Sequence, residues 1–106
     1  PGRMKLMEGH TRKLLTIVTE AAVEGTLIRD IERLGAHGYT ITDARGKGGR
    51  GVRNAGWEAS GNIRIEVVCD ADTASTIATY LQTHYYDNYA MILFVSSIDV
   101  LRSEKF

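Results

Sequence analysis

The sequence of 106 residues contains a single cysteine, no long apolar run and no excess of charge of either sign. Cys69 alone cannot form an internal disulfide, which favours a reducing compartment, and we expect a cytoplasmic protein. Because no apolar stretch is long enough to cross a bilayer and no secretory leader is recognisable, we expect no direct insertion into a membrane. The 13 basic and 13 acidic side chains cancel, which argues against coating of nucleic acid through overall charge.

Residues that commonly perform catalysis or bind metals do not form a recognisable arrangement. The histidines, His10, His37 and His84, do not stand at metal-ligand spacing with Cys69. No Ser-His-Asp or paired-carboxylate pattern can be argued from the spacings, and no P-loop signature is present. Glu20 and the acidic residues of the first predicted helix are expected to form a solvated face. The sequence therefore predicts no catalytic residues, no metal site and no enzymatic activity.

Glycine and positive charge are instead concentrated in one segment, residues 44–56. This segment contains four basic side chains and no acidic one. Glycine permits positive φ angles and lets backbone N–H groups approach a ligand, and cations beside such amides suit a phosphate or another small anion. The glycines also match a dinucleotide-binding fingerprint, but no helix begins where that motif needs one. The candidate functional site is therefore a loop over about 45–61, longer than ordinary connections.

The hydrophobic patterns on either side of this loop predict two matching halves. Strands are expected over 13–19, 39–42, 62–69 and 91–98. A helix follows the first and the third strand. Gly35 and Gly38 are expected to stop the first helix, with the residues between them as its C-terminal cap, and Asp70 or Asp72 caps the second. The order βαβ–βαβ predicts an α+β, ferredoxin-like fold, a four-stranded antiparallel sheet with both helices on one face. We assign residues 1–12 to an N-terminal tail or expression remnant and 13–106 to one domain.

One face of such a sheet has no helices to cover it. On the last strand this face is expected to carry Met91, Leu93 and Val95, or else the residues that alternate with them, together with Val68. Such a surface is too apolar to remain in water. We therefore expect a homo-oligomer in which the uncovered sheets close against each other.

Three stretches of the chain resemble a known family. The loop 46–53, the turn 86–90 and the strand end 17–20 look like the PII-like signalling proteins, in particular their inorganic-carbon branch, typified by SbtB and by the carboxysome-associated PII proteins. The resemblance runs from about Lys13 to Leu101. It implies a homotrimer of ferredoxin-like subunits that signals rather than catalyses, with an adenine-nucleotide site in each cleft between neighbours.

The resemblance also implies roles for individual residues of the loop, which corresponds to the T-loop of the family. Phosphate contacts are implied at the base of this loop for Gly46, Lys47, Gly48 and Arg50. Arg53 corresponds to a second loop arginine that reaches the same anion. The cations Lys47, Arg50 and Arg53 are accordingly the candidates for binding bicarbonate beside a nucleotide phosphate, because a guanidinium binds a planar anion through two hydrogen bonds.

Other nucleotide contacts are implied outside the loop. Tyr39, Thr40 and Val68 correspond to positions that line the adenine pocket, and Arg102 lies near a phosphate-binding arginine of the family. The aromatic turn replaces the B-loop, which the adjacent subunit supplies toward ribose and phosphates. The residues implied in this turn are Asp87, Asn88, Tyr89 and Ala90.

The turn also departs from the orthodox PII pattern. Orthodox members have a glycine-rich B-loop that ends in a phosphate-binding lysine, whereas this turn is aromatic and ends in Ala90. A missing charge-assisted contact, worth roughly 1.5–3 kcal/mol, weakens the preference for a triphosphate. We therefore favour AMP and ADP as effectors, with cyclic AMP and ATP as further candidates. The expected partner is a bicarbonate transporter or another protein of carbon uptake.

Two alternatives from other classes remain open at this point. An Arg/Gly-rich loop on a ferredoxin-like sheet with aromatic strands also suits a module that binds single-stranded RNA. Arg64 and Glu66 on the exposed face, the missing RNP1 pattern and the zero net charge count against it, and we expect no nucleic-acid ligand. A trimeric scaffold whose loop binds only protein is the other alternative. Trp57 fits equally a loop anchor and an aromatic that faces a partner.

Overall fold

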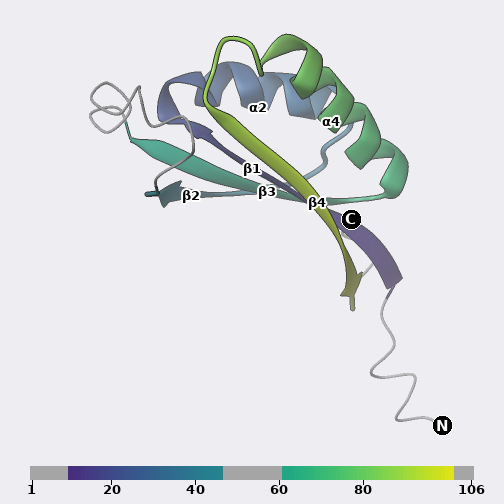
Figure 1. The fold of residues 1–106 in the computed structure, drawn as a ribbon. Coiled ribbons are helices and arrows are strands. Elements are labelled where there is room, and N and C mark those ends of the chain that lie inside the picture. The colour runs from purple at the N-terminus through teal and green to yellow at the C-terminus, as the bar shows by residue number, and fades with distance from the viewer. Residues whose placement is uncertain (1–9, 47–60, 102–106) are drawn as a thin grey trace, which may run out of the picture.

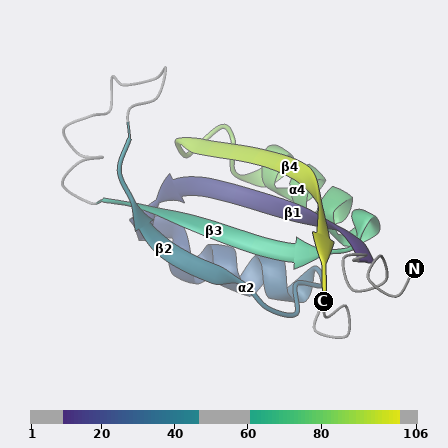
Figure 2. The same cartoon turned by 90° about the horizontal axis from the view of Figure 1, so that it is seen from below.

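A computed structural model describes residues 10–46 and 61–101 of the chain. The elements are β1 (His10–Glu20), η1 (Ala21–Val23), α2 (Glu24–Arg33), β2 (Thr40–Ala44), β3 (Asn62–Cys69), α4 (Ala71–His84) and β4 (Met91–Val100). The strands form one antiparallel sheet in the order β2-β3-β1-β4. Both helices cover the same face of the sheet, as Figures 1 and 2 show. The predicted ferredoxin-like fold is confirmed.

The hydrophobic core lies between the sheet and the two helices. Alternate residues of β1 and β3 point toward the helices, because successive side chains of a strand point to opposite faces. Both helices contribute apolar residues four positions apart, which share one helix face. The side chains with no exposed surface in this layer are Leu15, Ile17, Leu27, Ile31, Ile65, Val67, Ile77 and Leu81.

The turn after α2 reverses the chain at a glycine. Gly35 has a φ of 118°, a region that favours glycine. The N–H of Gly35 donates to the carbonyl of Glu32 at 3.1 Å, and the N–H of Ala36 donates to the carbonyl of Ile31 at 2.9 Å. This is a Schellman motif, with Ala36 and Ile31 both buried beneath it. Of the two glycines predicted to stop the first helix, Gly35 forms the turn, and Gly38 lies beyond it.

The start of α4 is fixed by a side-chain cap. The carboxylate of Asp70 accepts a hydrogen bond from the backbone N–H of Thr73 at 2.8 Å. That hydrogen bond lowers the pKa of Asp70. Of the two capping residues that the sequence offered, the structure selects Asp70, and Asp72 lies in the first turn of the helix.

β1 and β4 are longer than the sequence predicted. β1 and β4 pair continuously from His10 opposite Val100 to Thr19 opposite Met91, because their hydrogen-bond ladder continues past the apolar stretches on which the prediction relied. β1 therefore includes His10–Arg12, and the assignment of these three residues to the tail 1–12 was wrong.

The face of the sheet opposite the helices, here called the open face, carries a mixed surface. Its central residues are Thr16, Val18, Arg64, Glu66, Ile92 and Phe94. Met91 and Leu93 pack against the core, so the alternative set of β4 residues faces away from the helices. Ile92 and Phe94 are 52% and 48% exposed. Val68 lies on the same face, opposite Leu14 of β1.

Candidate functional site

The predicted site residues divide into those that the structure describes and those that it does not. Tyr39, Thr40, Gly46, Val68 and the turn up to Ala90 lie within the described residues. The others lie outside the described residues: Lys47, Gly48, Arg50, Arg53, Trp57 and Arg102. The geometry of the site is therefore built from the edge strand β2, its neighbour β3 and the turn between α4 and β4.

The edge strand β2 runs between two groups of predicted site residues. Thr40 begins β2 and pairs with Glu66, and Val68 follows two residues later on β3, so Thr40 and Val68 share the open face. Gly46 follows the other end of β2, up to about 20 Å away along an extended chain. The structure thus brings Thr40 and Val68 together and places Gly46 at the opposite end. An elongated ligand along β2 would contact both ends.

Tyr39 has a contact that the sequence did not predict. Its hydroxyl donates a hydrogen bond to the carboxylate of Glu32 in α2 at 3.0 Å. This hydrogen bond raises the pKa of Tyr39. The hydroxyl is therefore held against α2, whereas Thr40, the next residue, points to the open face.

The aromatic turn is organised around Tyr85, which directly follows α4 as its C-cap. The carbonyl of Tyr85 accepts hydrogen bonds from the backbone N–H groups of Asn88 and Tyr89, both at 3.1 Å. The rings of Tyr85 and Tyr89 lie with their centroids 5.7 Å apart. The side chains of Asp87 and Asn88 are exposed at the top of this turn. The turn thus has a defined backbone shape and presents a carboxylate and an amide to its surroundings.

The last residue of the turn is held by the end of β1. The hydroxyl of Thr19 donates to the carbonyl of Ala90 at 3.0 Å, and the N–H of Ala90 donates to the carboxylate of Glu20 at 2.8 Å. Glu20 therefore accepts a hydrogen bond that holds the end of the turn in place. The prediction that Glu20 belongs to a solvated face was wrong. The topology could have indicated this contact, because β1 and β4 are neighbours and Thr19 stands opposite Met91.

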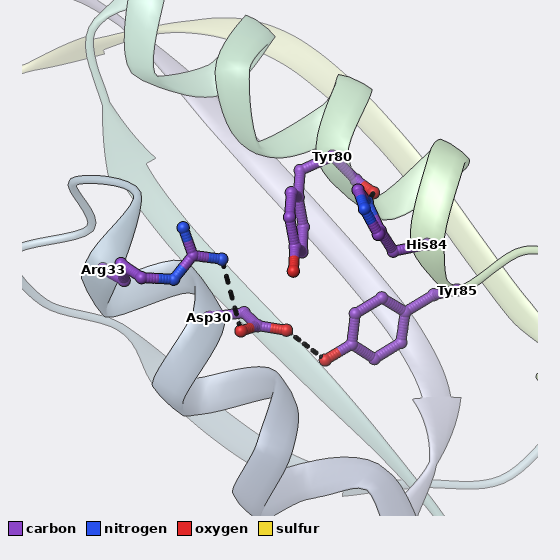
Figure 3. A network of polar contacts seen from close by, with 5 residues as sticks. All are labelled: Asp30, Arg33, Tyr80, His84 and Tyr85. Carbon is purple, nitrogen blue, oxygen red and sulfur yellow. Dashed lines mark hydrogen bonds and ion pairs between the residues drawn. The ribbon is translucent and has the colours of Figure 1, made fainter.

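A second polar network joins α2 to the start of the turn (Figure 3). The hydroxyl of Tyr85 donates to one oxygen of Asp30 at 2.6 Å, and Arg33 lies 3.4 Å from the other oxygen. Burial, followed by the hydrogen bond to Asp30, raises the pKa of Tyr85. The guanidinium of Arg33 lies 5.0 Å from the ring of Tyr80, which stacks on His84. The prediction that Asp30 belongs to a solvated face of the first helix was therefore also wrong, because its carboxylate contacts Tyr85 and Arg33.

The loop base and the turn of one chain lie at the same end of the sheet but on opposite edges. Ala44 of β2 pairs with Asn62, which pairs with Glu20, and β4 begins beside Thr19. Three inter-strand steps separate β2 from β4, roughly 14 Å. A ligand phosphate at the loop base is thus remote from the turn of the same chain.

The described part of the chain gives no sign of a metal centre or a membrane span. Among residues 10–46 and 61–101, no cluster of three or more His, Cys, Asp or Glu side chains could bind a metal ion. No helix within the same residues has the length and hydropathy needed to span a bilayer.

The fold defines the class of protein: a split βαβ subunit with a long insertion between β2 and β3 and an anchored turn before β4. The sequence matches the family model of the nitrogen regulatory protein P-II over residues 12–105, and the chain belongs to this family. Members of the family are signalling proteins rather than enzymes. The resemblance seen in the sequence is confirmed.

Solved structures of similar proteins extend this finding. The chain is 44% identical to a PII-like signalling protein from Thermus thermophilus, with a TM-score of 0.79 over 94% of this chain and 99% of that one. It is 26% identical to CPII from Thiomonas intermedia bound to ADP and bicarbonate, with a TM-score of 0.78 over 92% and 95% of the two chains. Another CPII structure, with ADP, AMP and acetate, shares the fold at 23% identity and a TM-score of 0.78, over 92% of this chain and 95% of that one.

Proposed function

We propose that this protein is a non-enzymatic signalling trimer that binds ADP or AMP between subunits, together with bicarbonate, and regulates inorganic-carbon uptake through the loop 45–61. The observation that carries the proposal is the similarity to CPII bound to ADP and bicarbonate, which extends over 92% of this chain. The match to the family model, over residues 12–105, includes β2 and β4, the two edge strands from which the site would be built.

The open face supports assembly of identical subunits. Ile92 and Phe94 are about half exposed there, although each is a large apolar side chain. Three buried polar atoms have no hydrogen-bond partner within the described residues: Arg12 Nε, Thr16 Oγ1 and Asn62 Oδ1. All three residues occupy positions on this same face. A covering subunit would bury the apolar side chains and supply polar partners.

Assembly also explains how one ligand can contact residues on opposite edges of the sheet. Thr40, Val68 and the loop base lie along the β2 edge, whereas Asp87 and Asn88 lie at the β4 edge. In the proposed site, the β2 edge of one subunit and the turn of its neighbour enclose the nucleotide. Lys47, Arg50 and Arg53 supply the positive charge for phosphate and bicarbonate.

The composition of the turn supports a preference for the shorter nucleotides. Ala90 contributes no cation, and both of its backbone groups are already bound to Thr19 and Glu20. The terminal phosphate of ATP therefore gains no charge-assisted hydrogen bond from this position. AMP and ADP need no such contact.

The signalling step follows from the charge of the loop. Bound anions offset the repulsion among its cations and select one loop conformation among several. A partner, which we propose to be a bicarbonate transporter or another carbon-uptake protein, then recognises that conformation. The occupancy of the site by ADP, AMP and bicarbonate would in this way control uptake.

Isothermal titration calorimetry with ADP, with and without bicarbonate, tests the proposal. We expect one ADP per subunit and a change in ADP affinity when bicarbonate is added. Replacing Arg50 with Ala should weaken ADP binding by about tenfold or more, because a charge-assisted contact is lost. Arg29→Ala, which removes an equal charge from the exposed side of α2, should leave the affinity unchanged.

The same titration decides between the proposal and its alternatives. Absence of ADP and AMP binding by the wild-type protein would refute the nucleotide site. Binding of a single-stranded oligoribonucleotide in place of ADP would establish the RNA-binding alternative. No response to either class of ligand would favour the protein-binding scaffold.

A further inference from the structure

The hydrogen bond between α2 and the end of α4 is short and charge-assisted. Tyr85 is only 4% exposed, and its hydroxyl lies 2.6 Å from the carboxylate of Asp30. An O–H···O⁻ distance in this range is typical of the stronger hydrogen bonds in proteins. The ring of Tyr85 is therefore fixed both by packing in the core and by the polar contact at its tip (Figure 3).

The backbone of the same residue determines the shape of the turn. The N–H of Tyr85 donates to Leu81 in α4, and its carbonyl accepts from Asn88 and Tyr89. Its ring also contacts the ring of Tyr89. A change in the position of Tyr85 would consequently move Asn88 and Tyr89, two of the residues expected to face the nucleotide.

The turn is thus held at both of its ends by other elements. Through Asp30, α2 holds Tyr85, which directly precedes the turn 86–90, and β1 holds the last residue of the turn, Ala90, through Thr19 and Glu20. Asp87 and Asn88 are exposed between these two attachments. A binding segment that is already ordered loses less conformational freedom when its ligand arrives, which raises affinity.

We propose that Asp30 is a positioning residue for nucleotide binding, which acts through Tyr85 on the turn that contacts the nucleotide of the adjacent subunit. This inference rests on the proposed function. Asp30 itself lies on α2, and its carboxylate contacts Tyr85 and Arg33. Through its hydrogen bond with Tyr85, the carboxylate of Asp30 keeps the turn in the conformation that binds the nucleotide.

The test compares ADP affinity in the wild type, Asp30→Asn, Tyr85→Phe and the double variant, well below the unfolding temperature of each. If the altered turn spends about a tenth of its time in the binding shape, the apparent Kd rises about tenfold. Both single variants should show this loss, and the double variant should bind no more weakly than either, because the two groups act through one hydrogen bond. The backbone NMR signals of Asn88 and Tyr89 should shift in both single variants.

Two control variants match the changes in charge and in hydroxyl content. Glu24→Gln removes one negative charge from the first turn of α2, and Thr83→Val removes a hydroxyl of α4 that donates to the carbonyl of Thr79. Both controls should keep wild-type ADP affinity.

The possible failures are distinguishable. Absence of ADP binding by the wild type would refute the proposed function, and with it this inference. Wild-type affinity in Asp30→Asn and Tyr85→Phe, even with a lowered melting temperature, would show that the hydrogen bond serves stability alone and would overturn the inference. Additive losses of affinity in the double variant would also overturn it, because Asp30 would then act independently of Tyr85.

Discussion

The two faces of the sheet differ although the same strands build them. On the helix side, Leu15, Ile17 and Ile65 have no exposed surface and belong to one continuous core. On the open face, the neighbouring residues of the same strands combine apolar side chains with the Arg64–Glu66 ion pair and with buried polar atoms that lack partners within the described residues. The helix side forms a core within one chain, whereas in the proposed assembly a second chain covers the open face.

This difference separates stability within a subunit from stability of the assembly. Burial against α2 and α4 stabilises the subunit at any protein concentration. Burial of the open face by another copy stabilises the fold only as far as subunits associate, so that contribution depends on protein concentration. Variants on the two faces should therefore respond differently to dilution.

The largest effect is expected on the helix side. Ile65→Ala removes a fully buried side chain and leaves a cavity between the sheet and the helices, so it should lower the free energy of unfolding by about 2–5 kcal/mol. Urea unfolding at several protein concentrations should give the same loss each time. Ile92→Ala on the open face should instead lose stability mainly in concentrated solution, where the subunits associate, and this loss should shrink on dilution. Equal behaviour of the two variants on dilution would contradict the contrast between the faces.

The next prediction concerns assembly. Phe94→Glu places a charge on the open face at a side chain that is 48% exposed in the single chain. Because burying an unpaired charge against another subunit is strongly unfavourable, this variant should sediment as a folded monomer in analytical ultracentrifugation. Thr79→Glu places the same charge on the exposed side of α4 and should leave the oligomer intact. A Phe94→Glu protein that stays oligomeric would remove the open face as the subunit contact.

A smaller effect is expected in the helix layer. Tyr85→Phe removes a hydrogen bond to a carboxylate and should lower the free energy of unfolding by about 1.5 kcal/mol. The raised pKa of Tyr85 means that its neutral hydroxyl is favoured in the folded state. This contribution is fully present below the ordinary pKa of 10.0 and is lost as the pH rises above it. The melting temperature of the wild type should accordingly fall more steeply above about pH 10 than the melting temperature of Tyr85→Phe.

The smallest effect is expected for the ion pair on the open face. Arg64 and Glu66 lie 3.2 Å apart with side chains 47% and 37% exposed. Exposed ion pairs contribute at most about 1 kcal/mol and are screened by salt. Glu66→Gln should therefore change the melting temperature of the monomeric Phe94→Glu protein only slightly, and less at high salt. A large, salt-independent change would show that the pair is essential to the sheet itself.

The sequence predicted the fold well because the patterns that specify strands and helix ends lie within short stretches of the chain. Alternation along β3 identified the strand Asn62–Cys69 at its observed bounds, and the glycine at position 35 marked the end of the first helix. The extension of β1 to His10 escaped prediction because it depends on pairing with β4, which is distant in the sequence.

The candidate site was less predictable because its organisation is not local. Nothing in the spacing of Asp30 and Tyr85, or of Glu20 and Ala90, shows that they meet, since each pair joins different elements across the fold. The acidic residues Glu20 and Asp30 resemble ordinary solvated carboxylates in the sequence. The resemblance to the PII-like proteins identified the turn, but only the structure shows what holds it.

The central claim is that two subunits together form the nucleotide site. Calorimetric titration of ADP into the monomeric Phe94→Glu protein, beside the wild type, tests it most directly. We predict that the wild type binds one ADP per subunit and that the folded monomer binds ADP at least about a hundredfold more weakly, because the turn of the neighbour is missing and several contacts are lost together. Wild-type affinity in the monomer would contradict the account.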